Sequence, residues 1–420
     1  MKNKNMKSNS KNKDLNIFVT LNPTKGKGIP IAVKDNYLTK GLRTTAASLV
    51  LGDFIPQYSA TVVKKLEKNG YWVYGKTNLD AWCHGSSTET SDYGPTLNPY
   101  DTTRLSGGSS GGSAVAVATG IVDVAIGSET AGSVRGPASW CGVVGLKPTY
   151  GRVSRYGVIA MGSSLDSPGV LSKNVTLSAK ILKIIAGKDP MDATSSDKEV
   201  PDYESALTGD IKGIKIGLVE NYFLDEMDDE VKKVVLNTLS VFEKLGAEIV
   251  KVKTIDPKYA IGVYTVVQRS EVASNLSRYD GIRYGGKREL FGTEAKRRIM
   301  LGNFTLSEGY SDKYYKKAQK VRTLYINDFN KLFESVDVLI GPTMPNIAPK
   351  IGATKDQAMF GELADVLAEP SSISGLPAIS VPCGFAHDLP VGLQIIGNKF
   401  EEGKILNVAF AYEQSNKNDK

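Results

Sequence analysis

The chain has 420 residues, of which 41% are hydrophobic and 23% are charged, a composition typical of a globular protein with a large core. This length excludes a minimal module held together by disulfides. The formal net charge is +7, and much of it comes from lysines in residues 1–14, so the totals do not indicate a strongly basic nucleic-acid groove.

Residues 1–14 are rich in Lys, Asn and Ser and are expected to form a disordered basic tail. From Gly28 onward, short apolar runs alternate with helical patterns. In chain order, the first part predicts a strand over 29–33, a helix over 60–69 that ends at Gly70, a strand over 71–74, a helix over 112–119 and a buried strand over 121–126. This alternation predicts a mixed or parallel sheet covered by helices on both faces.

The second part of the chain continues in the same way. It predicts a strand over 214–219, an amphipathic helix over 228–245, a strand over 248–252, a long charged helix over 312–334, and core strands over 336–340, 379–381 and 392–396. The sequence has no evident repeat and no Pro/Ser-rich linker. We therefore expect an α/β fold in which residues 15–420 form a single domain.

The cysteines and histidines limit the chemistry of the protein. The 3 cysteines are widely spaced and form no CxxC pair, which indicates reduced thiols in a cytoplasmic protein. The 2 histidines cannot build a His-rich metal site, so no metal is predicted. The basic N-terminus is not followed by an apolar stretch, and the weakly polar run 113–127 contains Asp123, so we expect neither a signal peptide nor a contact with a membrane.

Two loops rich in Gly and Ser are the most informative segments. They are LSGGSSGGS (105–113) and GSETAGSVR (127–135), and they flank one predicted helix–strand unit. Glycine allows a backbone to approach a ligand closely, and successive N–H groups in such turns bind anions. A serine hydroxyl beside such a turn is a plausible site for acyl transfer.

Other motifs also match these residues. GGSSG (107–111) fits the G-x-S-x-G nucleophile elbow, but residues 101–104 are a poor strand and His387 is the only downstream histidine. Ser195 and Lys198 have the Ser-x-x-Lys spacing, but they lie in a polar stretch that favours a solvated loop. Neither loop has the Lys-Ser/Thr ending of a phosphate loop. A plain turn-rich connection remains the alternative.

A serine nucleophile needs a base, and with so few histidines a lysine is the best substitute. Lys34 is the candidate because it ends the apolar strand predicted over 29–33, so its side chain starts from a buried element. A lysine acts as a base only when burial or nearby cations lower its pKa. The alternative is an ordinary lysine at a strand end that forms a salt bridge.

Several segments resemble the amidase signature family. They are GIPIAVKDN (28–36), GGSSGGS (107–113), GSETAGSVRGPASWCGVVGLKPTYGRVSR (127–155) and PAISVPCGF (377–385). Within that family, the chain is similar to the glutamine-hydrolysing subunits of tRNA-dependent amidotransferases. That narrower resemblance rests on SSTETSDYGPTLNPYD (86–101), SNLSRYDGIRYG (274–285), KRRIMLGNFTLSEGY (296–310) and YYKKAQKVRT (314–323).

The resemblance implies an amidase-signature fold and a Ser-Ser-Lys triad. Ser133 matches the nucleophile, Ser109 the bridging serine, which is often preceded by a cis peptide bond, and Lys34 the base. The backbone amides of Thr130, Ala131, Gly132 and Ser133 match the oxyanion hole. Tyr264, Arg298 and Asp365 match the residues that hold the glutamine substrate.

Two residues of the second Gly-Ser loop depart from the family pattern, and Ser372 and Ala368 stand where an Asn and a Thr are common. Glu129 stands where the family has Asp, and Ala131 stands where it has the first Gly of a G-G-S turn. Ala131 adds a Cβ to a tight turn, which the backbone tolerates if φ stays negative.

The resemblance also implies partners. The chain would be one member of a heterotrimer with B and C subunits, and it would supply ammonia to the B subunit. That partner would bind ATP, Mg²⁺ and Glu-tRNA(Gln), while this chain would carry no cofactor. A stand-alone hydrolase of a small amide and a non-catalytic scaffold with the same fold remain the alternatives.

Overall fold

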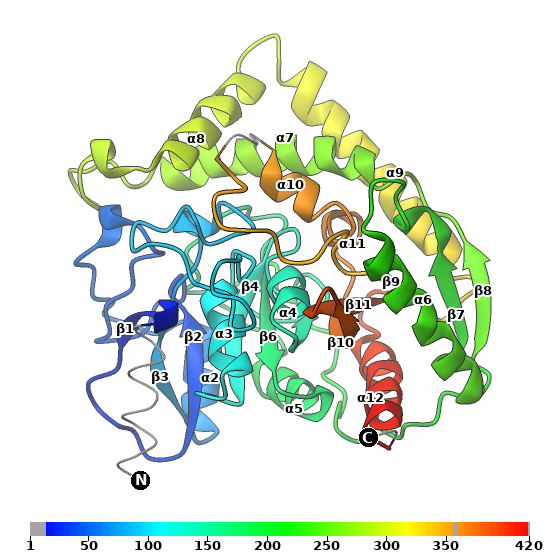
Figure 1. Ribbon diagram of the computed structural model, residues 1–420. Helices are drawn as coiled ribbons and strands as arrows, with labels where there is room; N and C mark the ends of the chain where they lie inside the picture. Colours follow the sequence, from blue (N-terminus) through cyan, green and yellow to red (C-terminus); the bar gives the residue numbers. More distant parts are fainter. Residues whose placement is uncertain (1–13, 356–358, 419–420) are drawn as a thin grey trace.

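The computed structural model describes residues 14–355 and 359–418 (Figure 1). The predicted basic tail therefore lies outside the described residues, except for Asp14, which is helical. The expected α/β fold is confirmed.

A mixed sheet of 11 strands forms the centre of the described molecule, in the order β1-β3-β2-β4-β6-β5-β10-β11-β9-β7-β8. The strands are β1 (Phe18–Leu21), β2 (Ile29–Lys34), β3 (Tyr71–Thr77), β4 (Val124–Glu129), β5 (Val144–Lys147), β6 (Ser167–Ser172), β7 (Lys215–Val219), β8 (Glu248–Val252), β9 (Val338–Pro342), β10 (Ala378–Ala386) and β11 (Leu389–Gly397). The sheet is mixed because β2 runs parallel to β3 and β4, and β7 runs parallel to β8 and β9, whereas β4 and β6 are antiparallel.

Helices cover both faces of this sheet, as predicted. They are α2 (Thr61–Lys68), α3 (Gly111–Ala118), α4 (Arg135–Trp140), α5 (Val175–Ile185), α6 (Asp229–Lys244), α7 (Lys258–Leu276), α8 (Thr293–Leu306), α9 (Lys317–Leu332), α10 (Phe360–Ala364), α11 (Glu369–Ile373) and α12 (Glu402–Asn418). Along β2, Ile31 and Val33 pack in the core that includes α2 and α5, whereas Ala32 packs in the core with α3 and α4. Figure 1 shows α7, α8 and α9 as an arch over one end of the sheet, with α10 beneath it.

Some predicted boundaries are wrong. The strand predicted over 121–126 is β4, Val124–Glu129, because Gly120 has a left-handed φ of +70° and the N–H groups of Ile121 and Val122 still bond to the carbonyl of Ala116 in α3. The helix predicted over 312–334 begins as a π-helix, Asp312–Lys316, and α9 ends at Leu332. The strand predicted over 336–340 is β9, which is shifted by two residues.

The parallel pair β2 and β4 fixes the place of the candidate site. Ala32 pairs with Ala125 and Val33 with Ile126, so both strands end at the same edge of the sheet. Lys34 is the last residue of β2, and the second Gly-Ser loop follows Glu129 at the end of β4. The first Gly-Ser loop leads directly into α3, so both loops lie near this edge.

Candidate active site

The lysine and the two Gly-Ser loops meet as the resemblance implied. Lys34 and Ser109 are fully buried, and Lys34 Nζ lies 2.7 Å from Ser109 Oγ. Lys34 Nζ also donates a hydrogen bond to the carbonyl of Ser128, at 3.0 Å. The N–H of Ser110 donates to the carbonyl of Ser133, at 3.1 Å, so the two loops are joined. The peptide bond between Gly108 and Ser109 is cis, as expected.

The environment of Lys34 favours the neutral amine. Burial lowers the pKa of Lys34, and Cys83, Asp80 and Asp166 oppose that effect. Within the described residues, Lys34 has no carboxylate at ion-pair distance, so the salt-bridged alternative is wrong. The amine therefore has the setting that a lysine base requires.

Two other buried lysines serve different partners. Lys76 forms an ion pair with Asp35, at 3.4 Å, and burial lowers its pKa to about 8. Lys147 donates to the main-chain carbonyls of Leu376 and Pro148, and burial lowers its pKa to about 7. Lys34 differs from both because its amine contacts a serine of the Gly-Ser loops.

Glu129 shapes the turn that follows β4. Its Oε2 accepts hydrogen bonds from the N–H groups of Val134 and Arg135, at 2.9 and 3.0 Å. Its Oε1 accepts from Arg135 Nε, at 2.8 Å, and this ion pair is fully buried. Arg135 also donates to the carbonyl of Ala131, at 2.9 Å. Glu129 therefore keeps the carboxylate that the family's Asp would supply, and this carboxylate orders the turn.

The turn between Glu129 and Val134 leaves backbone donors available. Ala131 is not among the residues with positive φ, so the condition set by the sequence is met. In the described part of the chain, the N–H groups of residues 130–133 donate no hydrogen bond to the protein. Such unpaired donors at one turn can stabilise an oxyanion. The Thr130 hydroxyl is fixed separately, because it donates to Asp166 Oδ1 at 2.7 Å.

Asp365 lies directly against this turn. A Cβ added at Gly132 would come within 2.3 Å of Asp365 Oδ1, so a larger residue at this position would displace the carboxyl group. Asp365 Oδ2 accepts from the Ser86 hydroxyl, at 2.7 Å, whereas Oδ1 is buried and has no hydrogen-bond partner among the described residues. Burial raises the pKa of Asp365 to about 8, although Ser86 and Arg135 oppose that effect.

The raised pKa predicts that the Asp365 carboxyl destabilises the fold as the pH rises. An unfolded Asp loses its proton near pH 4, whereas folded Asp365 keeps it up to about pH 8, so stability falls across that window. Asp365→Asn cannot ionise. The unfolding temperature of this variant minus that of the parent protein should therefore increase as the pH is raised from 5 to 8, as measured by calorimetry. A difference that does not change with pH would contradict this effect.

Tyr264, Arg298 and Asp365 line one small cavity together with Gly85, Ser86, Gly361 and Glu362. The structure thus brings the three predicted substrate-binding residues together from α7, α8 and the end of α10. The cavity holds about 10 Å³, which is room for about one water molecule. A larger ligand requires its walls to move.

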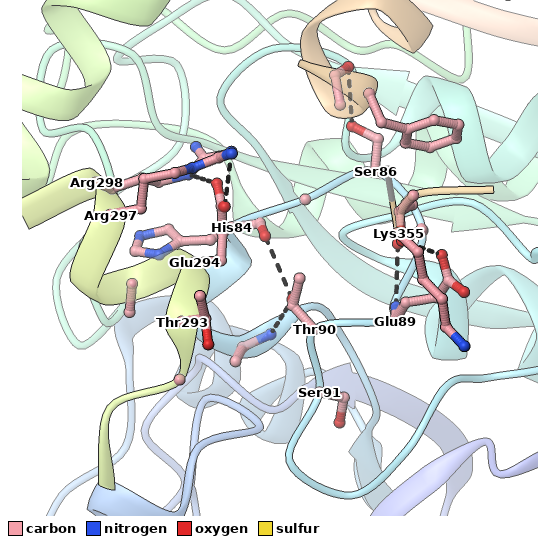
Figure 2. A pocket seen from close by; sticks show the side chains of 18 of the residues that line it. His84, Ser86, Glu89, Thr90, Ser91, Thr293, Glu294, Arg297, Arg298 and Lys355 are labelled. Carbon is pink, nitrogen blue, oxygen red and sulfur yellow. Dashed lines mark hydrogen bonds and ion pairs between the residues drawn. The ribbon is translucent and has the colours of Figure 1, made fainter. Parts of the chain in front are cut away.

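A wide cleft of about 620 Å³ adjoins this cavity and shares five of its lining residues, including Ser86, Arg298 and Glu362. Figure 2 shows Arg298 beside Glu294 on one wall and Ser86 with Glu89 and Lys355 across the cleft. Arg298 Nε donates to Glu294 Oε1 at 2.6 Å, and its Nη2 lies 3.7 Å from Glu362. A molecule that enters the cleft would meet this guanidinium before it reaches Asp365.

The competing motifs do not form sites. Residues 101–104 contain turns instead of the strand that a nucleophile elbow requires. His387 is half exposed and lies 3.2 Å from Asp228, the N-cap of α6. The hydroxyl of Ser195 donates to the carbonyls of Asp189 and Asp192, so this serine is buried in a turn and the expectation of a solvated loop is wrong for it.

Sequence reasoning missed two residues of the cavity. Ser86 holds Asp365, and Glu362 accepts from Arg269 at 2.8 Å while facing Arg298. Ser86 is the first residue of the segment 86–101, on which the narrower resemblance rests, so the sequence could have indicated a role for it. Glu362 had no such signal, because its partners are on other helices.

Within residues 14–355 and 359–418, no helix is long and apolar enough to cross a membrane. In the same part of the chain, no group of three or more His, Cys, Asp or Glu side chains could hold a metal ion.

Comparisons with known proteins show the family of the chain. A family model described as Amidase matches residues 21–406. The A subunit of glutamyl-tRNA(Gln) amidotransferase from Persephonella marina is 50% identical over 397 residues, which cover 91% of this chain and 82% of that protein. The protein with the same name from Halalkalibacterium halodurans is 52% identical over 403 residues, which cover 92% of this chain and 83% of that protein.

A solved structure gives the same result. The crystal structure of the A subunit of glutamyl-tRNA(Gln) amidotransferase from Thermotoga maritima matches with a TM-score of 0.86 and 43% sequence identity. The match covers 96% of this chain and 88% of that one. The expected amidase-signature fold is thereby confirmed.

Proposed function

The chain belongs to the amidase family, and we propose from this premise that it is the glutamine-hydrolysing subunit of a tRNA-dependent amidotransferase. The relatives that are named as A subunits of glutamyl-tRNA(Gln) amidotransferase support this proposal over most of both chains. The observation that carries it is the buried contact of 2.7 Å between Lys34 Nζ and Ser109 Oγ, beside a turn with free backbone donors.

In the proposed reaction, neutral Lys34 takes the proton of Ser109, and Ser109 takes the proton of Ser133. Ser133 Oγ then attacks the carboxamide carbon of glutamine. The backbone amides of residues 130–133 stabilise the negative charge on the carbonyl oxygen. The C–N bond breaks, and the relayed proton leaves with ammonia. Water then cleaves the glutamyl ester and restores the Ser133 hydroxyl.

The cavity residues would position the amino acid. The unpaired Oδ1 of Asp365 would face the α-ammonium group of glutamine, whose positive charge favours loss of the Asp365 proton on binding. The Arg298 guanidinium suits the α-carboxylate through paired donors. Tyr264 lines the edge of the same cavity. Because the cavity has room for only about one water, its walls must shift when glutamine binds.

The proposed reaction depends on two partner subunits. Ammonia would pass to the B subunit, which would use ATP and Mg²⁺ to activate Glu-tRNA(Gln) and convert it to Gln-tRNA(Gln). A C subunit would complete the heterotrimer, and the reaction would take place in the cytoplasm. We also infer that residues 15–420 act as one domain, which is supported by the continuous sheet from β1 to β8.

The test is reconstitution. The chain is purified alone and with its B and C subunits, and the hydrolysis of glutamine is measured with and without ATP and Glu-tRNA(Gln). We expect the three subunits to co-purify and glutamine hydrolysis to rise when the charged tRNA is present. Strong hydrolysis of unrelated amides by the isolated chain, with no response to the partners, would contradict the proposal and favour a stand-alone amidase.

A further inference from the structure

A carboxylate on helix α8 holds the arginine that would bind the α-carboxylate of glutamine. Glu294 lies one turn before Arg298, and its Oε1 accepts a hydrogen bond from Arg298 Nε, at 2.6 Å (Figure 2). Its Oε2 lies 2.7 Å from Arg297 Nη2. Glu294 lines the wide cleft, whereas Arg298 also lines the small cavity. Both oxygens of Glu294 are therefore engaged by arginines at the rim of the proposed glutamine site.

The bond to Glu294 leaves one edge of the Arg298 guanidinium for a ligand. A guanidinium presents its N–H donors in a rigid fork, and a carboxylate can accept two of them in parallel. Nε is used by Glu294, whereas Nη1 is buried and has no hydrogen-bond partner among the described residues. Nη2 lies 3.7 Å from Glu362, which is too far for a hydrogen bond. The Nη1 and Nη2 groups are thus the pair that a substrate carboxylate can take.

Glu362 competes for this edge of Arg298. It is 2% exposed and lines the small cavity, and its Oε1 accepts from Arg269 Nη2, at 2.8 Å. A rotation of the Arg298 guanidinium toward Glu362 would turn the contact of 3.7 Å into a hydrogen-bonded pair and occupy the donors. The bond to Glu294 opposes this rotation because it fixes Nε.

We propose that Glu294 is a positioning residue, which keeps the Nη1 and Nη2 groups of Arg298 available to the α-carboxylate of glutamine. This inference rests on the proposed hydrolysis of glutamine. Burial would lower the pKa of Arg298, but Glu362 and Glu294 outweigh burial and raise it, so the guanidinium stays charged. The connected ion pairs join the cations of Arg269, Arg297 and Arg298 to two carboxylates, which leaves one positive charge for a ligand carboxylate.

The test separates the reach of the side chain at position 294 from its charge. Glu294→Asp keeps the carboxylate but is shorter by one methylene, whereas Glu294→Gln keeps an acceptor oxygen at the same reach without the charge. Each variant is purified with its partner subunits. We expect KM for glutamine to rise by about 10-fold in Glu294→Asp and to stay within about 3-fold of the parent in Glu294→Gln, with kcat within about 3-fold in both. Glu294→Ala, which lacks any acceptor, should behave as Glu294→Asp.

A second substrate shows whether the effect acts through the carboxylate. The amide 4-aminobutanamide is glutamine without its α-carboxylate, so the orientation of Arg298 should not affect it. We expect its kcat/KM to be the same in the parent and in the three variants, whereas a general distortion of the site would lower it together with that of glutamine. Labelling of Ser133 by a fluorophosphonate needs no substrate and should proceed at the parent rate in every variant.

Asp312→Ala supplies the matched control. Asp312 and Lys316 form an ion pair of the same spacing, at 2.6 Å, in an exposed segment, so this variant should leave KM for glutamine unchanged. A parent-like KM in Glu294→Asp and Glu294→Ala, an equal rise in Glu294→Gln, or an equal loss with 4-aminobutanamide would overturn the inference and leave the proposed function standing. A parent complex that neither binds nor hydrolyses glutamine would refute the proposed function, and the inference with it.

Discussion

Replacing Ser133 with alanine should abolish glutamine-dependent amidation and leave ammonia-dependent amidation intact. The variant removes the only atom that forms the ester, so we expect glutamine hydrolysis to fall by about 10⁴- to 10⁶-fold. The amidation step uses free ammonia and would take place on the B subunit, which the substitution does not touch. The measurement is formation of Gln-tRNA(Gln) by the three-subunit complex, with glutamine or an ammonium salt as the donor.

An exposed serine supplies the matched control for this variant. Ser240 lies on the solvent face of α6 and bonds only within its own helix, so Ser240→Ala should behave as the parent with both donors. The Ser133 hydroxyl lies in a tight turn, but its removal adds no atoms, so the fold should be retained. If glutamine still served as the donor in Ser133→Ala, another residue would have to be the nucleophile.

Replacing Lys34 with methionine should remove the base and keep the shape of the side chain. We expect glutamine hydrolysis to fall by about 10²- to 10⁴-fold, the usual contribution of a general base. Burial lowers the pKa of Lys34, which means that desolvation disfavours the charged amine and weakens the fold at pH values where the unfolded lysine is protonated. Lys34→Met should therefore unfold at a temperature no lower than the parent, as measured by calorimetry at pH 7.

A second buried lysine gives the contrast. Lys76→Met leaves Asp35 buried without its cation, and this loss should lower the unfolding temperature, since breaking a buried pair costs about 3–5 kcal/mol. In the parent protein, activity should rise with pH through the lowered pKa of Lys34, because only the neutral amine accepts a proton. Activity of Lys34→Met within tenfold of the parent would show that another group is the base.

The sequence was most informative where local rules determine the structure. The apolar run that ends at Lys34 is β2, and the Gly-Ser loop before Gly111 leads into α3. Both features follow from hydrophobic patterning and from glycine at tight turns, which depend on near neighbours in the chain. The resemblance then assigned roles to Ser109 and Ser133, and the structure places their loops together.

The sequence was least informative where the site depends on distant packing. The helix α7 buries residues on several sides, including the polar Gln268 and Arg269, so it has no clean apolar stripe that would predict a helix. Asp365 follows the five-residue helix α10 and bonds to Ser86, which is 279 residues away in the chain. Trp82 and Cys83 form a left-handed turn that neither residue type predicts.

The most direct test of the proposed chemistry is the mass of the enzyme stopped by acid during turnover. The complex is mixed with glutamine, quenched in acid and digested, and the masses of the peptides of this chain are measured by mass spectrometry. We predict that the peptide containing Ser133 gains the mass of glutamine less ammonia, and that Ser133→Ala shows no such peptide. A glutamyl group found on another residue, or turnover of glutamine with no acyl group at any quench time, would contradict the assignment of Ser133 as the nucleophile.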